Sequence, residues 1–192
     1  MSTRVRFATA GQVLEAYPRV ATEIGLRPGE ESPLDFARKL IAAANRFDAI
    51  VYVAFLLPRR EAVWWGCQCV RALKDGAADE ALLAAEAWVR EPEEERRRAA
   101  LALANSGDLA LPTTWLARAV GYSGGSVAAE GAHPAPAASD ATAISVKAAI
   151  VLALSERPLA TIRAWINACA EAGVRFADGG DAKVAPPQSG AA

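Results

Sequence analysis

The sequence is poor in the residues that most often carry chemistry in small domains. Its 192 residues include three cysteines and one histidine. The cysteines (Cys67, Cys69 and Cys169) are odd in number and irregular in spacing, which favours reduced, packed thiols over a disulfide framework. A zinc site needs more ligands than these, because the single histidine, His133, lies in a Pro/Ala-rich segment. The sequence therefore predicts no metal site and no cofactor.

The sequence also lacks an excess of charge of either sign and a long apolar run. With 21 basic and 22 acidic residues, its formal net charge is −1, so no electrostatic footprint indicates DNA, RNA or an anionic membrane. The most apolar segment, residues 141–154, is too short to span a bilayer and contains Lys147. The N-terminal residues lead into no apolar run typical of a signal peptide. We expect a cytoplasmic protein that binds no nucleic acid and inserts into no membrane.

Aromatic residues make up only 7% of the chain, and Ala, Leu, Val, Glu and Arg are abundant, which favours helices. Capping residues, prolines suited to a first helical turn and apolar residues at helical spacing mark the helices. Thr9, Ser32 and Asp48 are the expected N-caps. The predicted helices cover residues 10–24 with an interruption at Pro18, 33–45, 48–57, 58–73, 79–90, 92–104, 112–120, 141–154 and 158–173.

These helices predict an all-α fold. The apolar run 50–57 can also be read as a buried strand, but the flanking caps and the lack of a strand partner favour a buried helix. We expect a single-domain multi-helix bundle of consecutive antiparallel helix pairs over residues 1–177, closed by a hairpin of the last two helices. A long, mobile Gly/Pro-rich loop at about 121–138 precedes that hairpin. The tail, residues 178–192, lacks apolar anchors and is expected to be disordered.

The segment 56–71 concentrates aromatic, cysteine and arginine residues on one predicted helix. At about 100° per residue, Trp65 falls on the apolar face, where its burial supports the core. Arg60, Trp64 and Arg71 fall on the opposite face. Trp64 could be covered by guanidinium stacking, by another helix of the protein or by a partner, and we favour cover from the protein's own helices. These three residues are the candidate protein-binding surface.

The segment 93–98 reads Glu-Glu-Glu-Arg-Arg-Arg at the start of a predicted helix. The acidic residues lie at the positive helix end, and each has an arginine three or four positions later. This pattern predicts a solvated face whose charges pair with one another. Residues 99–104 are apolar on every side and are expected to be buried.

The predicted loop offers the second candidate site. Small residues with free amides could wrap an anion, although the lysine and the strand-to-helix context of a phosphate loop are absent. A hydrolase would need Cys67 or Ser123 to meet His133 as its base. The candidate ligand-binding residues are Ser123, Gly124, Gly125 and Ser126.

Residues 57–65 read LPRREAVWW and are followed by Cys67 and Cys69. This stretch resembles an uncharacterised family of bacterial proteins, a domain of unknown function with an LPRREAVWW-type signature. The resemblance extends from Phe7 through the loop at 123–126 to the last predicted helix. Members of that family are often encoded near type VI secretion components, so the resemblance implies an accessory or adaptor role. It implies no catalytic residue.

The residues and the resemblance together favour a non-catalytic helical protein-interaction module, an accessory or adaptor of a bacterial type VI secretion system. Its expected partner is a protein, either a component of the secretion apparatus or an effector. One alternative is a helical domain that binds a small ligand or an anion, and a less favoured one is a hydrolase.

Overall fold

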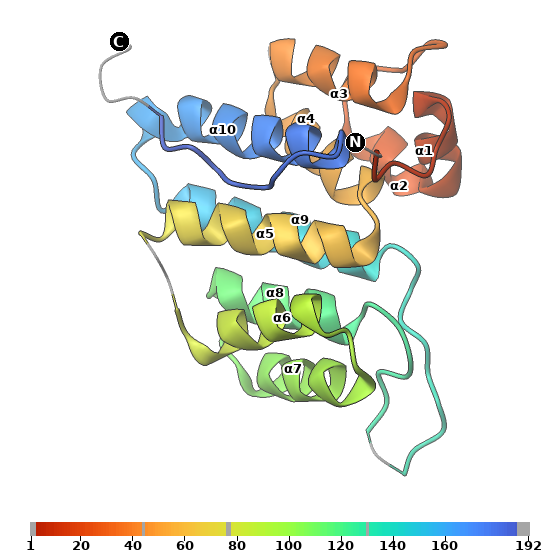
Figure 1. The fold of residues 1–192 in the computed structure, drawn as a ribbon, viewed down its shortest axis with the longest axis vertical. Coiled ribbons are helices and arrows are strands. Elements are labelled where there is room, and N and C mark those ends of the chain that lie inside the picture. Colours follow the sequence, from red (N-terminus) through yellow and green to blue (C-terminus); the bar gives the residue numbers. More distant parts are fainter. Residues whose placement is uncertain (1–2, 44, 76–77, 130, 188–192) are drawn as a thin grey trace. The chain divides into compact units, whose positions relative to one another are not determined.

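The computed structural model of the chain describes residues 3–43, 45–75, 78–129 and 131–187. Over these residues the fold is all-helical, with ten helices and no strand (Figure 1), which confirms the predicted fold class. The helices are α1 (Ala10–Ala16), α2 (Pro18–Glu23), α3 (Pro33–Ala42), α4 (Phe47–Leu56), α5 (Arg59–Leu73), α6 (Glu80–Arg90), α7 (Glu94–Ser106), α8 (Pro112–Gly121), α9 (Ala141–Ser155) and α10 (Leu159–Ala177).

The chain divides into two compact units. Unit 1 comprises Met1–Pro58 and Leu154–Ala192, and unit 2 comprises Arg59–Ala153. Helices α1 to α4 and α10 therefore belong to unit 1, while α5 to α8 and nearly all of α9 belong to unit 2. Because α9 and α10 fall in different units, the closing hairpin expected from the sequence stays a prediction.

Helix α4 forms the core of unit 1. Every residue from Asp48 to Leu57 is buried, and the helix packs against α2, α3 and α10. The ring of Tyr52 lies edge-on to that of Phe36, with 5.0 Å between the centroids. The apolar run is thus the buried helix that the sequence favours over a strand.

Asp48 is not the N-cap that the sequence predicts. Helix α4 begins one residue earlier, at Phe47, and Asp48 lies buried in its first turn. Its carboxylate accepts hydrogen bonds from the Gly25 amide at 2.7 Å and from Nδ2 of Asn45 at 2.5 Å. Asp48, which the sequence suggests is a local cap, therefore binds the segment at Gly25, more than twenty residues away, to α4.

The caps predicted for the first helices are present. Thr9 accepts from the Gln12 amide in a capping box, and Pro18 interrupts the helix by starting α2 after Tyr17. Ser32 caps α3, with Pro33 as the first helical residue. Helix α3 ends at Ala42, slightly earlier than expected.

The C-terminal tail is anchored for most of its length. Helix α10 continues through Gly173, the predicted end, to Ala177. Beyond it, Ala182 and Val184 are buried, and Nη2 of Arg175 donates to Oδ1 of Asp181 at 3.1 Å. The expectation of a tail without apolar anchors is therefore wrong up to residue 187. Residues 188–192 lie outside the described residues.

Unit 2 is built around α5, which begins at Arg59 directly after Pro58. Trp65 is fully buried, as its helical position predicts. A Cβ atom on Gly66 would lie 2.8 Å from Cδ2 of Leu116 and 3.0 Å from Cγ1 of Val146. The absence of a side chain at Gly66 therefore lets α5 approach α8 and α9 closely.

Helix α7 is less buried than its sequence suggests. Its N-cap is Glu93, so it begins two residues after Pro92, where the sequence places its start. Ala99 and Ala102 are exposed, which shows that alanines alone do not define a buried face, because each covers little surface. The expectation of burial over residues 99–104 holds only for the inner side of the helix, at Ala100, Leu101 and Ala104.

Candidate functional site

Arg60, a candidate protein-binding residue, contacts the end of α6. Its Nε donates to the carbonyl of Val89 at 2.6 Å, and its Nη2 donates to the carbonyl of Arg90 at 3.2 Å. The last carbonyls of a helix have no partner within the helix. Arg60 therefore caps α6 from outside.

Arg71, the second candidate, forms an ion pair within unit 2. Its Nε and Nη2 donate to the two oxygens of Glu86, with Nη2 2.9 Å from Oε2. Glu86 is only 3% exposed, and Nη2 of Arg90 lies 3.5 Å from the same Oε2. The hydrogen bonds to Glu86 raise the pKa of the Arg71 guanidinium. A forked pair of this kind stabilises the packing of α5 against α6.

Trp64, the third candidate, is half-buried between these two arginines. Because Arg60 and Arg71 both donate to α6, the side of α5 that carries Trp64 is turned towards α6. The sequence correctly groups the three residues on one side of the helix. The structure uses both arginines within the fold, and a role for this surface in binding a partner stays a prediction.

The loop residues predicted to bind a ligand present carbonyl oxygens to arginines. The carbonyl of Ser123 accepts from Nη1 of Arg59 at 2.8 Å, and that of Ser126 accepts from Nη2 of Arg97 at 2.9 Å. Gly125 has φ +59°, and a Cβ there would lie 2.8 Å from Nη2 of Arg97. This left-handed conformation favours glycine and lets the loop close over the guanidinium.

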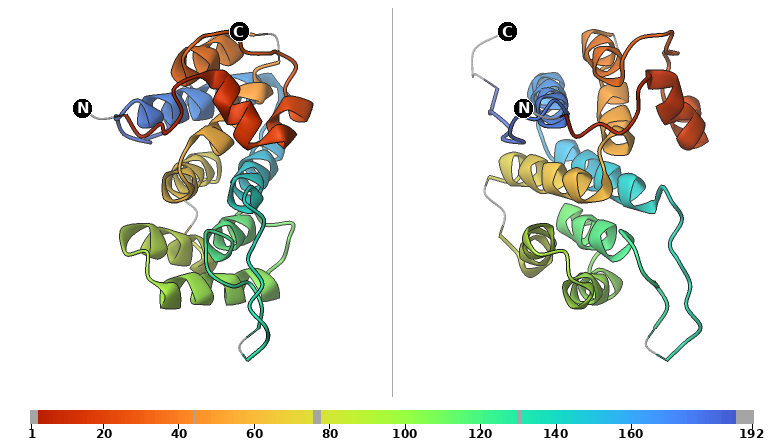
Figure 2. Two further views of the ribbon diagram at one scale, coloured as in Figure 1. Left: turned by 90° about the vertical axis from the view of Figure 1, so that its right-hand side faces the viewer. Right: turned by 45° about the vertical axis from the view of Figure 1, so that its right-hand side comes forward.

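Gly124 differs from its neighbour, because no atom lies within 4 Å of a Cβ built on it. The hydroxyl of Ser126 accepts from the amides of Ala128 and Ala135, each at 3.1 Å. Figure 2 shows the connection between α8 and α9 as a long arm whose two limbs run side by side, joined by the bridge between Ser126 and Pro136. The segment 123–126 thus forms the start of that arm, directly after α8.

Arg97 corrects the prediction of a fully solvated face over residues 93–98. The expected pairs exist, since Arg97 and Arg98 both donate to Glu94. Arg97 itself, however, is only 3% exposed and also donates to the carbonyl of Gly121 at 2.5 Å. The hydrogen bonds from Arg97 hold the pKa of the Glu94 carboxyl below its usual value. The sequence cannot show this burial, because the covering loop lies about thirty residues away.

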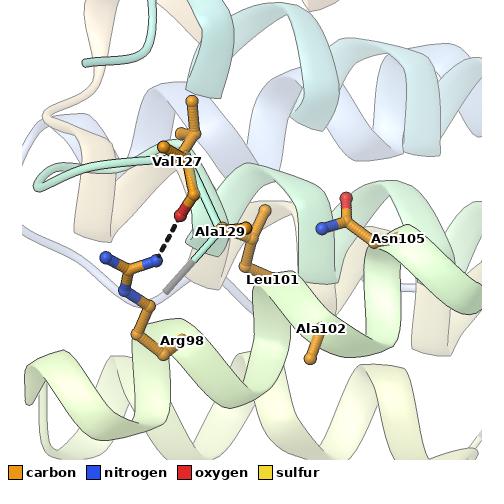
Figure 3. Close-up of a pocket in the computed structure, with 7 residues that line it drawn as sticks. Arg98, Leu101, Ala102, Asn105, Val127 and Ala129 are labelled. Atoms are coloured by element: carbon orange, nitrogen blue, oxygen red, sulfur yellow. Dashed lines mark hydrogen bonds between the residues drawn. The ribbon is translucent and has the colours of Figure 1, made fainter. Parts of the chain in front are cut away.

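A shallow hollow of about 210 Å³ lies between α7 and the arm (Figure 3). Leu101 and Val127 form its apolar part, and Asn105 lies at one end. At the other end Nη1 of Arg98 donates to the carbonyl of Ala128 at 2.7 Å. The hollow has room for an apolar side chain, and Arg98 already uses a donor to hold the arm.

Helix α8 carries a surface that the sequence analysis did not single out. Eight of its ten residues are buried, and the two that are not are Trp115 and Arg118. Leu111 precedes them by one turn and Tyr122 follows them by one turn, so all four lie within about 60° of one another around the helix axis. We call these four residues the α8 stripe.

Three members of the α8 stripe, Trp115, Arg118 and Tyr122, contact one another. The guanidinium of Arg118 lies 5.2 Å from the ring centroid of Trp115 and 5.6 Å from that of Tyr122. Its Nε donates to the Tyr122 hydroxyl at 3.1 Å, and the indole Nε1 of Trp115 donates to the carbonyl of Leu109 at 2.9 Å. Leu109 and Leu111 are 48% and 45% exposed. The spacing of residues 111, 115, 118 and 122 was the available signal in the sequence.

The three residues suggested for a hydrolase lie in different surroundings. Cys67 is fully buried, and burial raises the pKa of its thiol. The hydroxyl of Ser123 donates to the carbonyl of Val120 at 2.7 Å. His133 is exposed on the arm. A buried thiol is a poor nucleophile because the reactive form is the thiolate.

The fold and the α8 stripe define an all-helical protein with an ordered aromatic and arginine surface. The chain belongs to a family of unknown function (DUF6931), which matches residues 36–177. No curated protein and no solved structure matches the chain. The family match includes both α5 and α8. Over the described residues, no helix is long and apolar enough to cross a membrane.

Proposed function

We propose that this chain is a non-catalytic helical protein-interaction module and that the α8 stripe is its binding surface. The observation that carries the proposal is the contrast within α8, where only Trp115 and Arg118 are left unburied. Tryptophan, tyrosine and arginine are the residues most enriched among those that dominate binding energy. The stripe holds one of each, already ordered, so binding loses little side-chain entropy.

The resemblance of the segment 57–65 to proteins encoded near type VI secretion components supports the choice of partner. We propose an accessory or adaptor role in which the partner is a component of that apparatus or an effector. A cytoplasmic location fits the three cysteines, all of which are buried. An anion-binding role at residues 123–126 has less support, because this segment presents carbonyl oxygens to Arg59 and Arg97.

Affinity capture from the native host tests the proposal, with tagged wild type beside the Trp115→Ala and Trp64→Ala variants. We expect a specific partner with wild type and with Trp64→Ala, and its loss with Trp115→Ala. Loss of a central tryptophan anchor costs about 2 kcal/mol or more, which is roughly thirtyfold in Kd. Circular dichroism and thermal unfolding check that both variants keep the fold.

The two tryptophan variants separate the outcomes. Loss of the partner with Trp64→Ala alone would move the surface to the side of α5 that carries Arg60, Trp64 and Arg71. If both variants retained the partner, neither surface would be the binding site and the proposal would be wrong.

A further inference from the structure

We infer that Arg118 binds a carboxylate of the partner, on a protein segment whose apolar side chains contact Leu111 and Trp115. This inference rests on the proposed function, since it names the chemistry that the α8 stripe would recognise. Three observations support it. They are the lack of acceptors for the terminal nitrogens of Arg118 among the described residues, the two aromatic rings that contact its guanidinium, and the nearly half-exposed leucines just before α8.

Arg118 differs from the other arginines of unit 2. Among the described residues, each of the other seven directs a terminal guanidinium nitrogen at a carbonyl or a carboxylate of its own unit. Arg118 directs only its Nε, at the Tyr122 hydroxyl, and neither of its terminal nitrogens has a hydrogen bond or an ion pair within the described part of the chain. The seven others are Arg59, Arg60, Arg71, Arg90, Arg96, Arg97 and Arg98.

The guanidinium of Arg118 is nevertheless held in place. Both ring centroids, of Trp115 and Tyr122, lie within the range of about 6 Å in which cation–π attraction acts. The bond from Nε to the tyrosine hydroxyl fixes the remaining rotation of the group. A planar fork that is fixed at one nitrogen and free at the other two matches the two oxygens of a carboxylate.

The surroundings of Arg118 favour a protein segment over a free anion or a polyanion. Leu109 and Leu111 precede the stripe's aromatic residues in the chain and are nearly half exposed. Trp115 holds the turn that carries them through its bond to the Leu109 carbonyl. Nucleic acids and anionic lipid surfaces require several cations in a row, whereas this stripe sets one cation among apolar side chains. An apolar segment with a single Asp or Glu fits both features.

A phage-displayed library of short random peptides provides the probe. The library is selected on the full-length wild-type protein, after removal of the phage that bind Trp115→Ala. We expect the enriched peptides to combine an Asp or Glu with neighbouring apolar residues. In a synthetic peptide of this set, exchange of Glu for Gln should raise Kd by at least about tenfold.

The matching change in the protein tests the contact itself. Arg118→Gln should raise Kd for the acidic peptide by a similar factor and leave Kd for its Gln analogue unchanged, because the two changes remove the same contact. Arg118→Lys should restore only part of the affinity, since an ammonium lacks the planar fork. Arg96→Gln is the matched control, an arginine of the same unit outside the stripe, and it should leave both Kd values unchanged.

The outcomes distinguish this inference from the function on which it rests. Peptides that depend on Trp115 but carry no acidic residue, or an acidic peptide insensitive to Arg118→Gln, would overturn the carboxylate contact and leave the interaction module standing. Selection of no Trp115-dependent peptide would overturn the proposed surface and the inference together. Self-association of the wild type that Trp115→Ala abolishes, measured by light scattering, would replace the foreign segment with a second copy.

Discussion

Helices α5 and α8 carry similar residues at similar spacing but use them differently. On α5, Trp64 lies between Arg60 and Arg71, and both arginines are bound to α6. On α8, Trp115 and Tyr122 flank an arginine whose terminal nitrogens have no partner in the described part of the chain. The arginines of the α5 surface are bound by a neighbouring helix and the arginine of the α8 stripe is not, although Trp64 and Trp115 are both half-buried.

The difference shows that an arginine beside a tryptophan in the sequence can have either of two roles, a contact within the fold or a contact with a partner. On α5 the arginines find unpaired carbonyls at the end of α6 and a buried carboxylate, Glu86, so they contribute to the fold. On α8 the guanidinium contacts two aromatic rings and donates from Nε to the Tyr122 hydroxyl, and its terminal nitrogens have no acceptor in the described part of the chain. The role of each arginine is set by the acceptors that the fold brings within its reach.

The largest effect on stability should come from removing an arginine that is bound within the fold. Among the described residues, Arg71→Met leaves the buried Glu86 carboxylate with the more distant Arg90 as its remaining ion-pair partner, so it should lower the free energy of unfolding by about 3 kcal/mol. Urea denaturation measures this change. Arg118→Met is the control on the α8 stripe and should change stability by less than about 0.5 kcal/mol. If both changes lowered the free energy of unfolding equally, the arginines of α5 and α8 would not differ in their contribution to the fold.

A smaller effect should come from the loop that closes over Arg97. Gly125→Ala places a Cβ against the guanidinium in a left-handed conformation and should cost about 1–2 kcal/mol in thermal or urea unfolding. Gly124→Ala, where a Cβ meets nothing within 4 Å, should be close to neutral. If the two alanine variants were equally stable, Arg97 would not be held as firmly as the structure indicates.

The smallest effect should come from acidification of the Glu94 pair. Because Arg97 lowers the pKa of Glu94 in the folded state, the pair stabilises the fold above the carboxyl's unfolded pKa of about 4.3 and loses this contribution as pH falls through the lower folded value. Glu94 is 60% exposed on its side chain, so the contribution should stay below about 1 kcal/mol. Glu94→Gln should lose less stability than wild type between pH 5 and about pH 2. An identical pH dependence would count against the pair.

The sequence predicts the helices well because their signals are local. Thr9, Ser32 and Pro18 act within one turn of themselves, and the structure places helix ends at each of them. The predictions of Asp48 as an N-cap and of Arg97 as a solvated residue were wrong because their contacts are not local. Their partners lie more than twenty residues away, at Gly25 and at the Gly121 carbonyl, and no local pattern records a contact of that range.

The candidate site shows the same limit. The sequence correctly places Arg60, Trp64 and Arg71 on one side of a helix, because helical spacing decides this. It does not show that α6 supplies acceptors to both arginines, nor that the terminal nitrogens of Arg118 have no acceptor among the described residues. The acceptors within reach of an arginine are a property of the packed unit, since they depend on which groups the neighbouring helices bring near it.

Hydroxyl-radical footprinting of the two tryptophans tests the central claim most directly. The protein is labelled alone and with the partner recovered by affinity capture, and oxidation at Trp115 and Trp64 is quantified by mass spectrometry. We predict that the partner protects Trp115 and leaves oxidation at Trp64 unchanged. Protection of Trp64 with no change at Trp115 would contradict the account, because it would place the partner on α5.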